Sequence, residues 1–142
     1  MQVSGTATAT LDRPIAHAWE VLADHVGMTS WGPGLKVALT KEGSEDPNGV
    51  GAVRRISTPL PLPAIVEEVT AFDPERYLAY RALSGVPLRG YRGEVELTDR
   101  DGQTWISYTV HADSRIPVVD GVAVRVLANG LLAAYVRAAK RA

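Results

Sequence analysis

The chain has 142 residues, of which 46% are hydrophobic and 22% are charged, and these values suit one folded domain with a substantial core. Fifteen Lys and Arg against 16 Asp and Glu give a formal net charge of -1, which argues against a basic nucleic-acid surface or a polyanionic tail. Because the chain contains no cysteine, disulfides, thiolate metal sites and cysteine nucleophiles are excluded.

The same inspection bears on location and partners. The first five residues have neither the basic region nor the apolar region of a signal peptide. The most apolar run, Leu131 to Val136, is too short to span a bilayer. We therefore expect a cytoplasmic protein, a monomer or a homodimer, with no integral membrane association, no nucleic-acid partner, no metal and no cofactor.

The first third of the chain predicts a strand followed by a short helix. Residues 3–10 are small or β-branched, as in a strand. Asp12, Arg13 and Pro14 are typical of a helix start, with Asp12 as a possible cap. Apolar residues then recur at helical spacing: Ile15, Ala18, Trp19 and Leu22. We expect this helix to end near residues 24–27, before an irregular turn at residues 31–34.

The middle of the chain predicts a series of strands joined by short turns. We expect these strands at residues 35–40, 50–58, 64–72, 76–83, 90–98 and 103–112. Proline-rich or glycine-containing turn signals separate them, the clearest being residues 73–75 and 101–102. Consecutive strands on short turns favour an antiparallel meander.

The last stretch changes to a helical period. Its apolar residues recur at steps of three and four: Val119, Val122, Val126, Leu127, Gly130, Leu131, Ala134, Tyr135 and Ala138. Arg137 and Lys140 lie near its end, where the helix dipole favours cations. We expect a long amphipathic helix whose apolar stripe covers the sheet, with Gly130 and Ala134 leaving room for a ligand.

Folding the strands about their turns predicts a register. Arg54 then lies opposite Glu67, Val69 opposite Tyr80, and Tyr80 opposite Tyr91. One face of the sheet becomes mostly apolar, with Ile56, Ile65, Val69, Tyr80, Tyr91, Val95, Ile106, Tyr108 and Val110 on it. The other face is polar, apart from Trp105.

The predicted inner face also carries polar groups. Arg54 and Glu67 lie there as a pair, which serves either as an anchor for a polar or acidic group, as an acid/base pair, or as a structural salt bridge. Opposite Arg54, Glu67 should stay ionised, which weakens its use as a general acid. Tyr80, Tyr91 and Tyr108 either donate hydrogen bonds to a ligand or pack as ordinary core aromatics. Apolar walls with a few polar groups are typical of a ligand cavity.

Two further features are open to alternatives. Met28 and Trp31 either gate the cavity or pack within a hydrophobic loop. The histidines, His17, His25 and His111, have no metal-binding spacing, and we interpret them as surface or local structural residues.

The order of these features resembles a known family. A helix containing Trp19 and residues 22–24 is followed by Trp31, then residues 49–54, residues 67–69, Tyr80 and residues 104–108 before the last helix. This order resembles the START-like, helix-grip superfamily of the birch-pollen allergen (SRPBCC), in its polyketide cyclase/dehydrase and lipid-transport branch. The resemblance covers nearly the whole chain as one domain, residues 1–142.

The resemblance implies an α+β helix-grip fold. About seven antiparallel strands would wrap a long C-terminal helix, with two short helices after the first strand and a deep hydrophobic cavity between sheet and helix. It also implies that Trp31, Arg54, Glu67 and Tyr80 face the cavity. Because the family has no universal catalytic set, fold membership does not determine the chemistry.

Three functions follow from these observations. The first is a carrier or sensor that binds a hydrophobic small molecule, such as a lipid or polyketide, between the sheet and the last helix. The residues expected to line that site are Trp31, Arg54, Glu67, Val69, Tyr80, Tyr91, Tyr108, Leu127 and Leu131. The second is a polyketide cyclase or dehydratase, weakened by the absence of an inner-face histidine. The third is a protein-interaction module that uses the outer face of the sheet.

Overall fold

The computed structural model describes residues 2–142. Its elements follow one another along the chain as β1 (Gln2–Leu11), α1 (Ile15–Ala23), the 3-10 helix η1 (Val26–Trp31), β2 (Lys36–Lys41), β3 (Val53–Ser57), β4 (Ile65–Asp73), β5 (Tyr77–Ser84), β6 (Arg92–Arg100), β7 (Gln103–Asp113) and α2 (Pro117–Arg141). The series of strands between two helical segments confirms the predicted order of elements.

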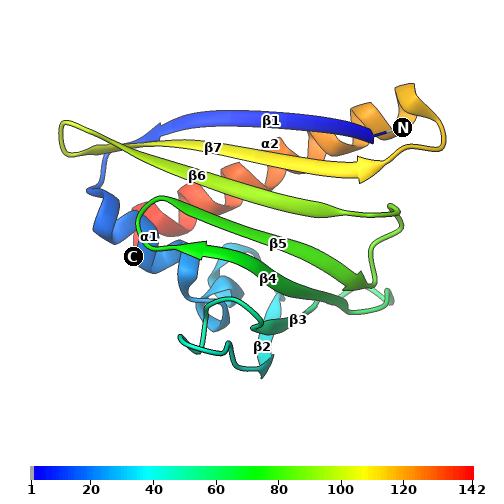
Figure 1. Ribbon diagram of the computed structural model, residues 1–142, viewed down its shortest axis with the longest axis horizontal. Helices are drawn as coiled ribbons and strands as arrows, with labels where there is room; N and C mark the ends of the chain where they lie inside the picture. Colours follow the sequence, from blue (N-terminus) through cyan, green and yellow to red (C-terminus); the bar gives the residue numbers. More distant parts are fainter. Residues whose placement is uncertain (1) are drawn as a thin grey trace.

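All strands belong to one antiparallel sheet. The seven strands are arranged in the order β1-β7-β6-β5-β4-β3-β2, so the first strand closes against the last. Figure 1 shows the long helix α2 running behind this sheet, with α1 near its C-terminal end. The arrangement confirms the predicted helix-grip fold, including the two short helices after the first strand.

The observed register slips by two residues between β5 and β6 and between β6 and β7, and both slips keep the predicted faces. Arg54 pairs with Glu67, and Val69 with Tyr80, as predicted. Tyr80 pairs with Gly93 instead of Tyr91. The β6–β7 turn is centred on Asp101 and Gly102, at φ 52° and 85°, one position later than the predicted fold point. Because side chains alternate with period two, an even slip leaves them on the same face.

The predicted register was also wrong within β4. Ala71 pairs with Ala79, and Phe72 with Leu78, because the ladder shifts between Val69 and Ala71. Such a bulge adds one unpaired residue to a strand, and the alternating pattern alone does not reveal it.

The start of α1 differs from the prediction. Helix α1 begins at Ile15, and Pro14 occupies the capping position without a side-chain hydrogen bond. Asp12 does not cap the helix; its carboxylate instead accepts a hydrogen bond from the Gln103 amide at 3.4 Å.

The buried face of α2 was predicted correctly only in its second half, where Tyr135 and Ala138 are buried as expected. Val119, Val122 and Val126 are 59%, 49% and 65% exposed, and Gly130 faces open space. The buried side chains are Val124, Ala128, Leu132, Tyr135, Ala138 and Ala139. This helix is apolar on several sides, so its sequence period is compatible with more than one stripe. Gly5 of β1 permits the close approach of α2, since a Cβ there would lie 2.7 Å from the backbone of Arg125.

Helix α2 is also the one segment within residues 2–142 that is long and apolar enough to cross a membrane. Its most apolar 18-residue window has a mean hydropathy of 1.4, and 22% of that window is buried. The prediction that rested on the short run from Leu131 to Val136 overlooked the length and hydropathy of the whole helix. In this fold α2 packs against β1 and β7. A helix that packs on a sheet can be as long and as apolar as a membrane-spanning helix, so length and composition alone do not distinguish the two.

Candidate functional site

Five polar side chains lie together on the inner face of the sheet, and we call them the inner-face polar cluster. They are Arg54 from β3, Glu67 from β4, Tyr80 from β5, Tyr91 just before β6, and Tyr108 from β7. Arg54 and Glu67 are each only 4% exposed, and the tyrosines are buried as well. The alternating pattern of the strands therefore places all five as predicted.

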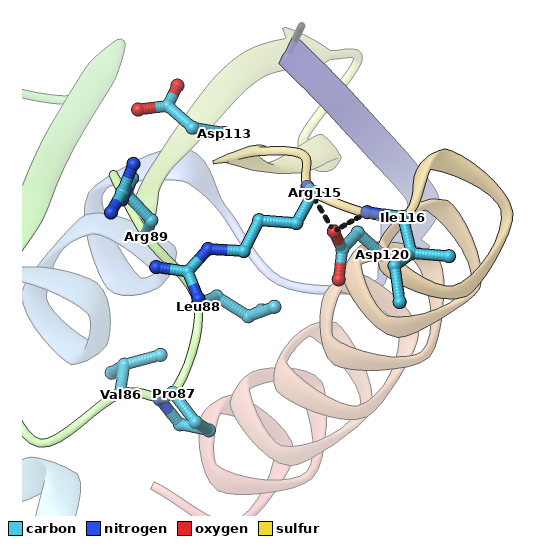
Figure 2. Close-up of a pocket in the computed structure, with 8 residues that line it drawn as sticks. All are labelled: Val86, Pro87, Leu88, Arg89, Asp113, Arg115, Ile116 and Asp120. Atoms are coloured by element: carbon cyan, nitrogen blue, oxygen red, sulfur yellow. Dashed lines mark hydrogen bonds between the residues drawn. The ribbon is translucent and has the colours of Figure 1, made fainter.

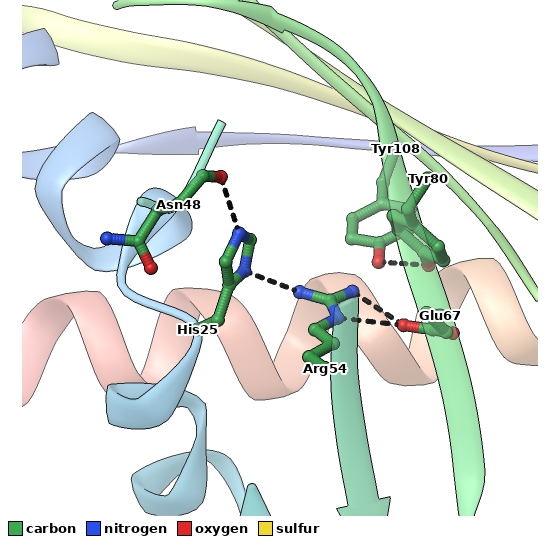
Figure 3. A network of polar contacts seen from close by, with 6 residues as sticks. All are labelled: His25, Asn48, Arg54, Glu67, Tyr80 and Tyr108. Atoms are coloured by element: carbon green, nitrogen blue, oxygen red, sulfur yellow. Dashed lines mark hydrogen bonds and ion pairs between the residues drawn. The ribbon is translucent and has the colours of Figure 1, made fainter. Parts of the chain in front are cut away.

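The central contact of the cluster is a buried ion pair. Arg54 donates from Nε and Nη2 to the same carboxylate oxygen, Glu67 Oε1, at 2.9 and 2.7 Å (Figure 3). Its guanidinium carbon also lies 4.7 Å from the centre of the Tyr80 ring. Burial is the largest single influence on Arg54 and opposes its charged form, but Glu67, Tyr80 and Tyr108 together outweigh burial, so the pKa of Arg54 lies above its ordinary value.

His25 joins this ion pair, which the sequence did not reveal. The interpretation of His25 as a surface or local residue missed that it is fully buried. Arg54 Nη1 donates to His25 Nδ1 at 3.1 Å, so Nε2 carries the proton and donates to the carbonyl of Asn48 at 2.8 Å. The residue lies between α1 and η1, and no periodic pattern marks that connection as facing the sheet. The site therefore contains the histidine whose absence weakened the enzyme hypothesis.

His25 is neutral at physiological pH. Burial, reinforced by the positive charge of Arg54, lowers the pKa of His25 from 6.5 to about 4. A neutral imidazole can accept the Arg54 hydrogen bond, whereas an imidazolium cannot.

Tyr80 and Tyr108 form a hydroxyl pair beside the arginine. Their oxygen atoms lie 2.6 Å apart, and Figure 3 shows the two hydroxyls converging next to Arg54 and Glu67. One hydroxyl donates to the other, which leaves the second proton for a different acceptor. Gly93 makes this placement possible, because a Cβ there would lie 2.4 Å from Tyr80 Cζ.

Burial keeps the phenols of the cluster protonated. It raises the pKa of Tyr91 to about 12, and raises the pKa of Tyr80 and Tyr108 well above the ordinary value. At neutral pH these hydroxyls can donate hydrogen bonds to a carbonyl or an enolate oxygen, but they cannot act as bases.

The other predicted lining residues lie in different surroundings. Val69 is buried beside Tyr80 as its cross-strand partner. Leu127 and Leu131 on α2 are half-buried and pack against the core. Trp31 is buried too, but it stacks on Tyr135 at 5.4 Å between ring centres, and its indole nitrogen forms no hydrogen bond to the inner-face polar cluster.

Trp31 carries an unsatisfied donor. Within residues 2–142, its indole Nε1 is the one buried side-chain nitrogen or oxygen without a hydrogen-bond partner. A buried unpaired donor costs about 1–3 kcal/mol. This N–H is therefore a donor in the packed interior without an acceptor among residues 2–142.

Two pockets open at opposite ends of α2. One, of about 390 Å³, lies between the β5–β6 connection and the start of the helix. The other, of about 480 Å³, lies between Trp31 and the end of the helix at Arg137 and Arg141. Neither pocket is lined by the inner-face polar cluster, which is enclosed in the packed interior between them. No group of three or more His, Asp or Glu side chains within residues 2–142 is placed to hold a metal ion.

Comparison with known proteins identifies relatives at the level of family and fold. The family described as polyketide cyclase / dehydrase and lipid transport matches residues 2–142. No curated protein sequence matches the chain.

Solved structures share the fold at low sequence identity. The crystal structure of Ara h 8.0201 is 16% identical, with a TM-score of 0.76 over 100% of both chains. The Zhui aromatase/cyclase from a Streptomyces species is 23% identical, with a TM-score of 0.74 over 99% of this chain and 95% of that chain.

Proposed function

The chain belongs to the polyketide cyclase/dehydrase and lipid transport family, and we propose that it binds a hydrophobic small molecule between the sheet and α2, as a carrier or sensor. The observation that supports this function best is the inner-face polar cluster enclosed in an otherwise apolar interior. The ligand would place its polar group at Arg54 and the tyrosine hydroxyls, and its apolar part against half-buried residues of α2 such as Leu127 and Leu131, which requires the packed interior around the cluster to open on binding.

The energetics of the ion pair support a functional use. Replacing a buried ion pair by apolar residues of similar volume is often neutral or stabilising, so stability alone does not require Arg54 and Glu67. Their presence in the core, together with the second hydroxyl proton of the Tyr80–Tyr108 pair, supplies polar groups for a ligand in an apolar environment. The unpaired Trp31 Nε1 is a further donor at the edge of the same interior.

Recovery of a bound compound tests this proposal directly. Native mass spectrometry of the purified protein should show a discrete adduct, which organic extraction releases for identification. Tyr80→Phe and Arg54→Gln should each lower the affinity for that compound. The matched control is Arg81→Gln, because Arg81 pairs with Glu68 at 2.8 Å on the outer face of the sheet. Absence of an adduct, together with no uptake of added lipids or aromatic polyketides, would contradict the proposal.

A second candidate function is cyclisation or dehydration of a polyketide. It is favoured by the Tyr80–Tyr108 hydroxyl pair beside Arg54, because protonated donors next to a cation can stabilise an enolate oxygen. The test is incubation with a synthetic linear poly-β-keto thioester, followed by chromatography and mass spectrometry of ring products. Loss of turnover with retained binding in Tyr80→Phe supports the enzyme; binding without turnover in the parent protein supports the carrier.

A further inference from the structure

The pocket at the start of α2 combines an apolar wall with unpaired charges. It lies between the β5–β6 connection and the first residues of the helix, and has a volume of about 390 Å³ (Figure 2). Val86 and Leu88 form part of its wall and pack inward against the core. Ile116, on the helix side, is 60% exposed. Exposed apolar side chains lining a concave surface are typical of a ligand-binding groove.

Two arginines line this pocket without a carboxylate at ion-pair distance among residues 2–142. Arg89 and Arg115 are exposed, and neither forms an ion pair within residues 2–142. Backbone hydrogen bonds from Ile116 and Arg115 lower the pKa of Asp120, and the charge of Arg115 helps to lower it. Figure 2 shows the Arg115 side chain extending toward Arg89 over the apolar wall. Two guanidinium groups on one pocket repel each other, and an anion between them would remove that repulsion.

The two carboxylates of the pocket differ in their roles. Asp120 accepts hydrogen bonds from the backbone N–H groups of Arg115 and Ile116, at 2.8 and 3.1 Å, and from the Ser114 hydroxyl. The Asp120 carboxylate therefore stabilises the start of α2 through these hydrogen bonds. Asp113 forms no side-chain hydrogen bond or ion pair within residues 2–142, and its negative charge would oppose an anion bound nearby.

We infer that this pocket binds the anionic end group of an amphipathic ligand, a carboxylate, sulfonate or phosphate ester, between Arg89 and Arg115. The apolar body of that ligand lies against Val86, Leu88 and Ile116. Val86 and Leu88 line the pocket and also pack against the core cluster that contains Tyr91, so the pocket wall is continuous with the interior where the proposed function places the ligand. The inference rests on the proposed function and adds a requirement for negative charge at the outer end of the ligand.

Two dyes that share an aromatic body and differ only in a sulfonate group test the contribution of negative charge to binding. 8-Anilinonaphthalene-1-sulfonate carries a sulfonate, and N-phenyl-1-naphthylamine is the same molecule without it. Fluorescence titration should show tighter binding of the sulfonate, weakened several-fold by raising the salt concentration. Arg89→Gln and Arg115→Gln should each lower the affinity for the sulfonate dye by roughly 5- to 10-fold and leave the affinity for the neutral dye unchanged.

Two further variants give matched comparisons. Asp113→Asn should tighten binding of the sulfonate by about 2- to 5-fold, because it removes a like charge. Arg55→Gln removes an exposed arginine of β3, which lies outside this pocket, and should change neither affinity.

Each outcome decides between the two proposals. Equal affinity for both dyes, or arginine variants that bind the sulfonate like the parent protein, would overturn the anion site and leave the proposed function standing. If neither dye binds, the anion site is overturned, and the proposed function is then decided separately by native mass spectrometry and the uptake of lipids or aromatic polyketides. Decanoate should displace the sulfonate dye, whereas inorganic phosphate at the same concentration should not. Displacement by inorganic phosphate would show a site for free anions and would overturn the requirement for an amphipathic ligand.

Discussion

Substitution of Gly93 by alanine tests whether the position of Tyr80 depends on a missing side chain. A Cβ at residue 93 would lie 2.4 Å from both Cζ and the hydroxyl oxygen of Tyr80. Ordinary carbon contacts begin near 3.5 Å, so the Tyr80 ring must move by about 1 Å. That movement breaks the 2.6 Å contact with the Tyr108 hydroxyl and moves the ring away from Arg54.

The magnitude follows from these two losses. Overpacking a well-packed core costs about 1–3 kcal/mol, and the lost hydrogen bond adds about 1 kcal/mol. We therefore expect Gly93→Ala to lower the free energy of unfolding by roughly 2–4 kcal/mol, which corresponds to a fall in Tm of about 5–12 °C for a domain of this size. The free energy of unfolding is measured by urea denaturation with tryptophan fluorescence as the signal, and the Tm is measured by calorimetry.

Two controls separate this clash from a general effect of alanine. Gly130→Ala, at an open position in α2, should raise the free energy of unfolding by about 0.5–1 kcal/mol, because alanine favours helix. The double variant Gly93→Ala with Tyr80→Leu should lose less stability than the two single changes together, since leucine removes the clashing atoms. A loss below about 0.5 kcal/mol in Gly93→Ala, or fully additive losses, would refute the reasoning.

Three other expectations concern the same core. Because the pKa of His25 lies at about 4 when folded and 6.5 when unfolded, the unfolded chain binds the extra proton between these values. Stability should fall by up to about 3 kcal/mol as the pH drops from 6.5 to 4, and urea titrations of His25→Gln should show a shallower fall. Glu67→Gln should cost about 3–5 kcal/mol by leaving Arg54 buried without its counter-ion, whereas Glu68→Gln on the outer face should cost at most about 1 kcal/mol in the same assay. Gly5→Ala should lower the Tm, because the new Cβ would lie 2.7 Å from the Arg125 backbone and push α2 away from β1; a calorimetric Tm equal to that of the parent would contradict this packing.

Strand alternation accounts for the part of the site that was predictable. Arg54, Glu67, Tyr80 and Tyr108 lie on strands whose side chains alternate with period two, so their burial on one face followed from the order of residues and the turns. Between β5 and β6, and between β6 and β7, the observed register differs from the predicted one by two residues. A shift of two residues leaves each side chain on its predicted face. The role of these four residues in binding a ligand stays a prediction.

Two features required the tertiary structure. His25 lies in an irregular connection between α1 and η1, where no period relates a residue to a face, and its contact with Arg54 spans 29 residues of sequence. Helix α2 is apolar on several sides, so its own residues are compatible with more than one buried stripe.

The amino-acid sequence by itself therefore determined the order of elements, the two faces of the sheet and the Arg54–Glu67 pair, because these depend on local periodicity and short turns. The tertiary structure alone decided which side of α2 is buried, where His25 points, and that Arg89 and Arg115 meet at one pocket. These depend on how segments far apart in the sequence pack, as where Gly5 lets the backbone of α2 approach β1.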